Sequence, residues 1–493
     1  MADSDKTKRP TLGIKPDAEA PSARTRAPVR GRHVPRDHSK PLPKLAADKA
    51  AEAKSGKERP KAGRPESAEG GNERRRPRPP GSVQARPEPR EQPEAQAPSS
   101  HDKRAPYAER PRTVNVEHFF VSCPRGLEAE LVRELAELGV TDARPAAGGA
   151  AFLGDLQLAW RVNLWSRLAI RVLWRVAEGR YRSEDDLYSS ARELDWPRLF
   201  DVSRTLAVTT LAHKSPLKSL NFASLKIKDA VCDGFRASVG ERPSVDTHTP
   251  DVPLVLYLTA DRFTLYLDLS GEPLNRRGFR VEPASAPINE NLAAGILRLA
   301  GWSPEQPLYD PMMGGGTFLI EAAMMALNIA PGLNHHFAFE KLGSFDMVEW
   351  QRLRKGAEAA QHEREPLAIY GSDNDPLMVR AAGLNLQAAG LLDSVVLREA
   401  DFLQVDAPPG PGLVVSNPPY GVRLSLADMA SFYKDMGDTL KKRYAGWTAA
   451  FISADPEFPK LIGLSANRRT PLYNGPLECR LYSYRLVSGS NRG

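Results

Sequence analysis

Residues 307–323 read PLYDPMMGGGTFLIEAA, and this stretch decides the fold of the second half of the chain. An apolar strand pattern leads into a triple-glycine turn, and a helical pattern follows at once. Glycines let the backbone approach a ligand closely, and the new helix offers free N–H groups. No Lys follows the glycines, which excludes a Walker A loop. The stretch predicts a site for a nucleotide or nucleoside-like cofactor, with a tight structural turn as the alternative; its expected contacts are Asp310, Gly314, Gly316 and Thr317.

Acidic residues follow the next two predicted strands. Residues 369–376 read IYGSDNDP, a strand that ends in carboxylates before a helix. An acid at the carboxyl end of such a strand can accept hydrogen bonds from a ribose diol, which favours Asp373, with Asp375 as a helix N-cap or a neighbour. After the strand at 395–397, Asp401 is expected to accept a hydrogen bond from an adenine amine; a cap or a solvated side chain is the alternative.

A fourth strand ends in a polar and aromatic loop, because residues 413–421 read LVVSNPPYG. The two prolines stiffen the backbone, so that the Asn417 side chain and the carbonyl beside it present acceptors in a fixed geometry. Two acceptors aimed at an exocyclic amine orient its lone pair toward an electrophilic methyl group, and Tyr420 can stack on the base. We therefore expect Asn417, Pro418 and Tyr420 to form the catalytic loop, whereas a plain turn is the alternative.

The pattern of elements predicts an α/β chain. From Leu308 onwards short buried strands alternate with helices, which is typical of a parallel sheet covered by helices on both faces. Upstream, a small α/β unit begins near Val114 with a strand and a helix at 126–138. Further strands are predicted at 206–210, 254–258 and 263–269, and further helices at 219–238 and 289–300. The predicted boundaries are 1–112 for a tail, 113–275 for an α+β module and 276–493 for the doubly covered sheet.

The first 112 residues have the composition of a disordered basic tail. They hold 18 of the 43 prolines, and 27 Lys and Arg against 16 Asp and Glu. Such a segment buries too little surface to offset its ordering entropy. An RNA-tethering arm and a solubilising extension are both compatible with it. The remaining residues hold 41 basic and 45 acidic residues, so contact with nucleic acid there requires local basic patches.

Composition also excludes several classes of protein. No run of 18 apolar residues occurs and the start lacks an apolar export segment, so we expect a cytoplasmic protein without a membrane contact. The cysteines Cys123, Cys232 and Cys479 are too far apart for a disulfide framework or a zinc site. The adjacent His335 and His336 lack a third ligand at a plausible spacing, so no metal is expected.

The order of the four segments resembles the class I methyltransferases that modify amino groups of adenine or guanine. Three upstream segments, NFASLKIKDA at 221–230, DLSG at 268–271 and RRGFR at 276–280, resemble the THUMP-containing bacterial 23S ribosomal RNA guanine-N2 methyltransferases. The resemblance spans roughly residues 114–487 and includes LYNGPLECR at 472–480. It implies a Rossmann-like class I methyltransferase domain behind a ferredoxin-like and THUMP RNA-binding module.

The resemblance further implies S-adenosylmethionine (SAM) as cofactor, with Glu290 helping to hold it, and Asn417 and Tyr420 serving the target guanine. The chain departs from the family in its glycine loop, where Met313 and Gly315 stand in place of Cys and Ser. The retained glycines should preserve cofactor binding. The chain also ends soon after this methyltransferase unit, so we expect it to lack the second catalytic half that some relatives carry.

These observations predict methyl transfer from SAM to the N2 amine of a guanine in large-subunit ribosomal RNA. Guanine-N2 methylation of tRNA, adenine-N6 methylation of nucleic acid and a non-catalytic RNA-binding or ribosome-assembly role remain alternatives. Basic residues around the proposed RNA module could neutralise phosphates, although a solvated face would explain each of them equally well. The candidates are Lys214, Lys218, Lys226, Lys228, Arg276, Arg277 and Arg280.

Overall fold

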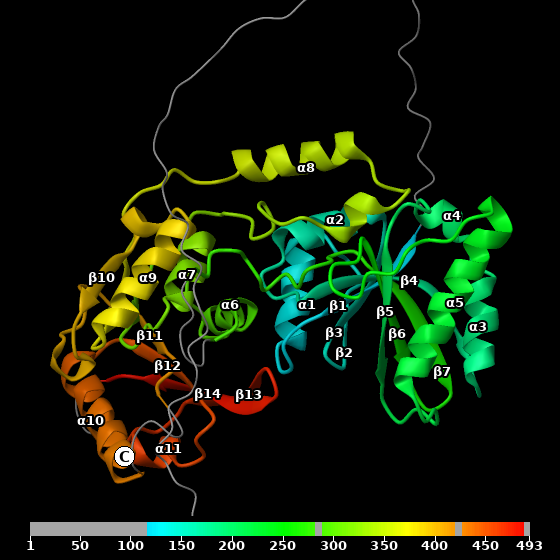
Figure 1. The fold of residues 1–493 in the computed structure, drawn as a ribbon. Helices are drawn as coiled ribbons and strands as arrows, with labels where there is room; N and C mark the ends of the chain where they lie inside the picture. Colours follow the sequence, from blue (N-terminus) through cyan, green and yellow to red (C-terminus); the bar gives the residue numbers. More distant parts are fainter. Residues whose placement is uncertain (1–115, 282–287, 420–425, 488–493) are drawn as a thin grey trace, which may run out of the picture. The chain divides into compact units, whose positions relative to one another are not determined.

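The computed structural model describes residues 116–281, 288–419 and 426–487. The predicted tail at 1–112 lies outside these ranges. Two seven-stranded sheets organise the described part, one in each half (Figure 1). Within these ranges no helix has both the length and the apolar character needed to cross a membrane.

The first sheet joins the two parts of the N-terminal module. Its strand order is β2-β3-β1-β4-β7-β6-β5, and the long strand β4 pairs with β1 on one side and β7 on the other. One continuous sheet therefore runs through the α+β module predicted at 113–275. Its elements are β1 (Glu117–Ser122), α1 (Glu128–Glu137), β2 (Arg144–Ala146), β3 (Gly149–Gly154), α2 (Leu156–Trp165), β4 (Arg171–Arg180), α3 (Glu184–Arg192), α4 (Trp196–Leu199), β5 (Leu206–Ala212), α5 (Leu220–Val239), β6 (Val252–Leu258) and β7 (Arg262–Asp268).

Side-chain alternation explains how this sheet is covered. In β7, Phe263, Leu265 and Leu267 are buried in the core, whereas Thr264 and Tyr266 between them are only partly buried. A strand with period-two burial packs one face against helices and leaves the other more open. The buried stripe of α5, which includes Ile227 and Val231, belongs to the same core.

The second sheet has the order β10-β9-β8-β11-β12-β14-β13. Strands β8 to β12 run parallel, and β14 pairs antiparallel with both β12 and β13. Its elements are α6 (Glu290–Leu299), β8 (Leu308–Asp310), α7 (Thr317–Ala326), η1 (Ala338–Lys341), α8 (Met347–Ala359), β9 (Ile369–Asp373), α9 (Pro376–Ala388), η2 (Leu392–Ser394), β10 (Val396–Glu399), η3 (Phe402–Gln404), β11 (Leu413–Ser416), α10 (Leu426–Arg443), β12 (Thr448–Ser453), α11 (Phe458–Leu461), β13 (Arg468–Asn474) and β14 (Leu477–Arg485).

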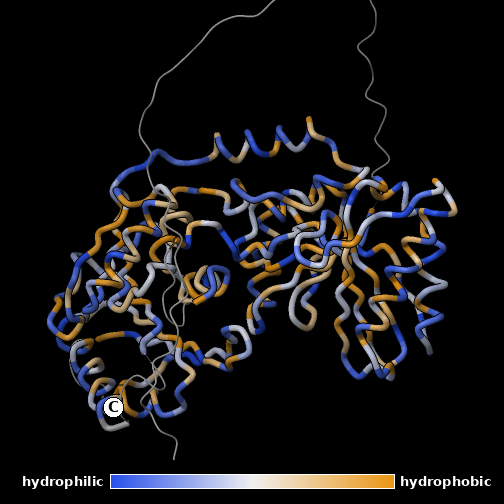
Figure 2. The backbone as a smooth tube through the Cα atoms, viewed as in Figure 1, coloured by the Kyte–Doolittle hydropathy of each residue, from blue (hydrophilic) through white to orange (hydrophobic). Residues whose placement is uncertain are grey.

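Both faces of this second sheet are covered by helices, as predicted. In β11, Leu413 and Val415 lie in one hydrophobic core and Val414 lies in another, and Ala450 and Phe451 of β12 divide in the same way. The central strands β11 and β12 are consequently buried along almost their whole length. Apolar segments, drawn in orange, run through this half of the chain in Figure 2. Buried, nearly continuous apolar strands are typical of parallel sheets.

Most predicted elements are confirmed to within a few residues. The helices predicted at 126–138, 219–238 and 289–300 correspond to α1, α5 and α6. The three predicted upstream strands correspond to β5, β6 and β7. Helical and strand periodicity are strong signals when the apolar face is long enough, as it is in these elements.

Candidate active site

The predicted site residues meet at the carboxyl edge of the second sheet. Strands β10, β9, β8 and β11 lie side by side and parallel, with Asp310 opposite Gly371 and Glu399 opposite Asp373. Because parallel strands all end at the same edge, the residues that follow them converge there, which is where open α/β sheets bind ligands. Asp310, Asp373 and Asn417 each stand at or just beyond the end of such a strand.

The glycine loop between β8 and α7 is anchored to β9. Gly314 has a φ of 51° and its N–H donates to the Asp373 carboxylate at 3.0 Å. Gly316 has a φ of 77° and forms the N-cap of α7, and Thr317 is the first helical residue. The side-chain amide of Asn385 in α9 donates to the carbonyl of Gly315 at 3.0 Å. The loop is thus held in place while the start of α7 faces the carboxyl edge.

Gly316 offers a direct test of this loop. Its backbone is left-handed, and a Cβ there would lie 3.2 Å from the Cβ of Ala382 in α9. We expect Gly316→Ala to cost about 1–2 kcal/mol of stability from the left-handed backbone alone, and to weaken SAM binding by moving the loop. The free energy of unfolding and the SAM dissociation constant, from urea titration and calorimetry, check this result.

Gly383 is the matched control, because it lies inside α9 and a Cβ there would meet only the Leu397 side chain, at the ordinary contact distance of 3.8 Å. Gly383→Ala should stabilise the chain by about 0.5–1 kcal/mol through helix propensity and leave SAM binding unchanged. Equal effects of the two substitutions would contradict a special role for the loop conformation.

Asp310 is a buried carboxylate at the centre of the site. It is 1% exposed and accepts hydrogen bonds from the Ser416 hydroxyl at 2.7 Å and from the Met312 N–H at 3.3 Å. Burial raises the pKa of Asp310 to about 7, opposed by these hydrogen bonds and assisted by the nearby negative charge of Asp373. Ser416 was not among the residues predicted from the sequence, although its position directly before Asn417 at a strand end was an available signal.

The other acidic candidates also have structural roles. Asp373 accepts the N–H groups of Gly314 and Asp375, and Asp375 caps α9 through the N–H of Leu377. Asp401 caps η3, accepting the Leu403 N–H at 3.0 Å and the Gln404 side chain at 3.3 Å. The capping alternatives therefore hold for Asp375 and Asp401. For Asp401, the assignment as an adenine contact remains a prediction.

The loop predicted to be catalytic begins directly after β11. Ser416 is fully buried, Asn417 is half-buried and Pro418 is buried. The carbonyl of Pro419 accepts a hydrogen bond from the Tyr433 hydroxyl of α10 at 3.3 Å, which ties the loop to that helix. Tyr420 lies outside the described residues. Asn417 is therefore placed at the carboxyl edge next to the strand that carries Asp310.

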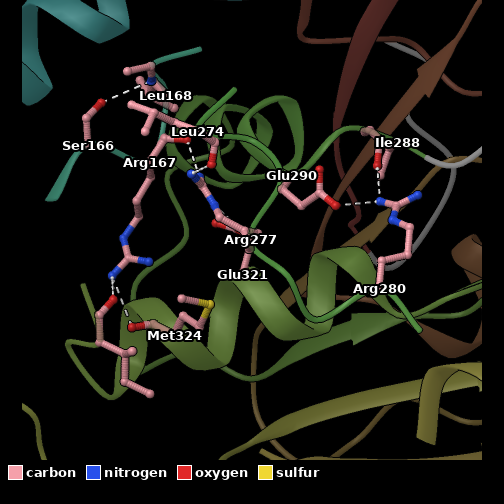
Figure 3. Close-up of polar contacts among 12 residues, drawn as sticks. Ser166, Arg167, Leu168, Leu274, Arg277, Arg280, Ile288, Glu290, Glu321 and Met324 are labelled. Carbon is pink, nitrogen blue, oxygen red and sulfur yellow. Dashed lines mark hydrogen bonds and ion pairs between the residues drawn. The ribbon is translucent and has the colours of Figure 1, made fainter. Parts of the chain in front are cut away.

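Glu290 begins α6 and is paired with a predicted RNA-binding residue. Its carboxylate lies 2.8 Å from the guanidinium of Arg280, which also donates to the carbonyl of Ile288 at 3.2 Å (Figure 3). The Glu290 side chain is 7% exposed and that of Arg280 is 28% exposed. The charge of Arg280 is therefore largely neutralised by Glu290.

Arg277 does not lie where an RNA contact requires it. Its side chain is 2% exposed and its Nε lies 3.2 Å from the carboxylate of Glu321, which is fully buried in α7 (Figure 3). It also donates to the carbonyls of Leu274 and Arg167. The prediction that Arg277 contacts phosphate is wrong for this structure, because a guanidinium enclosed by protein acceptors cannot reach RNA.

The remaining basic candidates fall into two groups. Lys226 pairs with Asp185 at 2.6 Å, Lys228 pairs with Asp229 and Arg276 pairs with Glu272 at 2.9 Å. Lys214 and Lys218 are exposed, and no ion pair is recorded for them within the described ranges. These two lysines are therefore available to bind a polyanion such as RNA. Over the same ranges, no group of three His, Cys, Asp or Glu side chains is arranged to hold a metal ion.

Family models match three consecutive parts of the chain. They are the RlmL ferredoxin-like domain at residues 118–173, the THUMP domain at 181–268 and the RMKL-like methyltransferase domain at 277–483. Together with the carboxyl-edge site, these matches define a class I methyltransferase with an upstream module of the kind found in RNA-modifying enzymes.

Known proteins agree with this class. A putative RNA methyltransferase of Synechocystis sp. is 38% identical over 75% of this chain and 96% of its own length. The ribosomal RNA large subunit methyltransferase K/L of Syntrophotalea carbinolica is 39% identical over 74% of this chain, which spans about half (53%) of that enzyme. A crystal structure of a putative methyltransferase complexed with SAH superposes with a TM-score of 0.70 at 30% identity, covering 76% of this chain and 99% of that one. The chain belongs to the family of THUMP-domain, SAM-dependent RNA methyltransferases.

Proposed function

We propose that this chain transfers a methyl group from SAM to the exocyclic N2 amine of a guanine in 23S ribosomal RNA. The observation that carries the proposal is the position of Asn417 and Pro418 at the carboxyl edge, one strand away from Asp310 and the glycine loop. The large-subunit specificity rests on the name of the K/L relatives, and the guanine-N2 specificity on the sequence resemblance.

The residues at this edge fit the cofactor. Gly314 and Gly316 have positive φ values and carry no side chain, so a ligand can approach the backbone at the start of α7 closely. Asp310 and Asp373 supply carboxylates for the cationic and hydroxyl groups of SAM, and Glu290 starts the preceding helix. When bound, SAM supplies the electrophilic methyl group.

Asn417 orients the base amine in this proposal. Its side-chain oxygen and a neighbouring backbone carbonyl accept the two N–H bonds of the amine, which directs the nitrogen lone pair toward the methyl carbon. The N–C bond forms as the S–C bond breaks, and the amine releases one proton to solvent. Positioning and fixed dipoles are sufficient to provide much of such a rate enhancement.

The proposal is tested by methyl transfer from labelled SAM into purified 23S ribosomal RNA, tRNA and DNA, followed by nucleoside mass spectrometry. N2-methylguanosine in 23S ribosomal RNA is the expected product. N6-methyladenosine, or label in tRNA only, would overturn the substrate assignment. The absence of label in every substrate would favour the non-catalytic, ribosome-assembly alternative.

The raised pKa of Asp310 predicts pH-dependent SAM affinity. A cationic cofactor prefers the ionised carboxylate, and this acid gains its proton as the pH falls through about 7. Affinity should therefore be highest above pH 7 and fall up to about tenfold per pH unit below it. Calorimetric titration between pH 5.5 and 8.5 measures the dependence.

Asp310→Asn is the control for this dependence. The amide cannot ionise, so the variant should bind SAM weakly and with little change across the same pH range. A pH profile identical to that of the unmodified chain would assign the titration to another group.

A further inference from the structure

The β13–β14 hairpin extends past the carboxyl edge of the catalytic sheet. Ser453, the last residue of β12, pairs with Arg480 of β14, which in turn pairs with Pro471 of β13. Three more residue pairs follow toward the tip, ending at Asn474 and Leu477. At about 3.3 Å per residue, the tip stands roughly 10 Å beyond the end of β12.

The hairpin projects on the same edge as the catalytic loop. Ser416 of β11 pairs with Phe451 of β12, and Phe451 pairs with Tyr482 of β14. Measured along the strands, Asn417 and Pro418 therefore lie level with Leu481 and Arg480. Two interstrand spacings separate β11 from β14, or roughly 10 Å. A nucleic acid that places one base at Asn417 consequently passes close to Arg480.

Positive charge is concentrated on this hairpin although the chain beyond the tail is mildly acidic. Residues 468–485 hold four Arg and one Glu. Strand alternation places Arg469 and Arg480 on one face as diagonal neighbours, and both are exposed. No ion pair is recorded for either within the described ranges, in contrast to Lys226, Lys228 and Arg276.

A third arginine joins this surface from the N-terminal module. The guanidinium of Arg125 lies 4.2 Å from the centre of the Tyr473 ring, and Arg125 is exposed. A cation–π contact holds the guanidinium in place without neutralising its charge. The next residue, Gly126, has a φ of 93°, and a Cβ there would collide with the carbonyl of Pro471. The loop that carries Arg125 is therefore packed closely against the hairpin.

We propose that Arg125, Arg469 and Arg480 form a phosphate-binding surface that holds the RNA backbone beside the target nucleotide. The inference rests on the proposed function, because it assumes that an RNA base enters the site at Asn417. Unpaired guanidinium groups attract phosphate without first breaking an ion pair, which favours these residues over the paired candidates near α5. Glu478 at the tip reduces the net charge of the surface but leaves it positive.

The test compares three variants across a series of salt concentrations. The double variant Arg125→Gln/Arg480→Gln removes two charges from the surface. Arg485→Gln is the matched control, because Arg485 lies on the same strand but pairs with Thr448 at the opposite edge of the sheet. Filter binding with in vitro-transcribed 23S ribosomal RNA gives the dissociation constants, and SAM calorimetry reports whether each variant is folded.

The double variant should bind RNA about tenfold more weakly, and its salt dependence should fall by roughly 1.4 to 1.8 units in the slope of log K against log salt. Arg485→Gln should leave the slope unchanged, and Arg480→Lys should retain it. At RNA concentrations below the dissociation constant, methyl transfer by the double variant should fall in proportion to its weaker RNA binding. Equal slopes for the double variant and Arg485→Gln would overturn the proposal.

Measurements of RNA binding and of methyl transfer distinguish a failure of this inference from a failure of the proposed function. A reduced slope in the double variant, with no methyl transfer by the unmodified chain, would retain the phosphate-binding surface and reject the proposed reaction. Methyl transfer into 23S ribosomal RNA with unchanged slopes would retain the reaction and reject the surface.

Discussion

Asn417→Ala is expected to reduce the rate of methyl transfer about 10²–10³-fold, the range seen when one preorganised polar contact to the reacting group is removed. The side-chain oxygen of Asn417 is the acceptor that we assign to the amine, and alanine removes it without disturbing β11. Ser416 would still donate to Asp310, so SAM binding should remain. Single-turnover methyl transfer with 23S ribosomal RNA measures the loss, and calorimetry measures SAM binding.

Asn334→Ala provides the matched control, since Asn334 is an exposed asparagine of the same domain outside the site. The Asn334→Ala variant should transfer the methyl group at the same rate as the unmodified chain. If Asn417→Ala retained the full rate, the catalytic assignment of the loop would be rejected. A parallel loss of SAM affinity would instead indicate that Asn417 supports the cofactor site.

Arg277→Met is expected to lower the free energy of unfolding by about 3–5 kcal/mol, because it leaves a buried carboxylate without its partner. Glu321 is fully buried, and burial raises its pKa, which Arg277 and Arg167 oppose. The substitution also removes the donors to the carbonyls of Leu274 and Arg167. Urea unfolding followed by tryptophan fluorescence measures the change.

Arg276→Met is the control from the adjacent position. Arg276 pairs with Glu272 on the surface, and such pairs contribute about 0–1 kcal/mol. The double variant Arg277→Met/Glu321→Leu should recover part of the stability, because it no longer buries an unpaired charge. A similar small loss for both single arginine variants would contradict a structural role for the buried pair.

The positions of the candidate site residues in the fold were predictable where a motif coincides with a strand end. Asp310 and Asp373 end short strands, and Asn417 directly follows one. Parallel strands bring their carboxyl ends to one edge of the sheet whatever the conformation of the loops between them. Local periodicity likewise predicted α1, α5 and α6 almost to the residue. These features depend on residues that are close in sequence, so a single sequence is sufficient to infer them.

The basic residues were predicted less well, because their environment depends on distant residues. The segment RRGFR at 276–280 has the composition of a phosphate-binding patch. In the structure Arg276 is a surface pair, Arg277 is buried against Glu321 and Arg280 pairs with Glu290. Conversely, Arg125 and Arg480 are 355 positions apart, and the sequence did not indicate that they share one surface. Charge in a sequence does not reveal which charges are already neutralised.

The sequence by itself determined the class of this protein, the order of its domains and the loop that we assign to catalysis, because strand periodicity, glycine turns and the Asn-Pro-Pro-Tyr segment act over a few residues. Only the tertiary structure decided which acids serve as caps, which arginines are enclosed and that the two halves of the N-terminal module share one sheet. The physical reason is that burial and ion pairing are properties of contacts between distant segments. Their energies are set by the surroundings of each group and not by its neighbours in the chain.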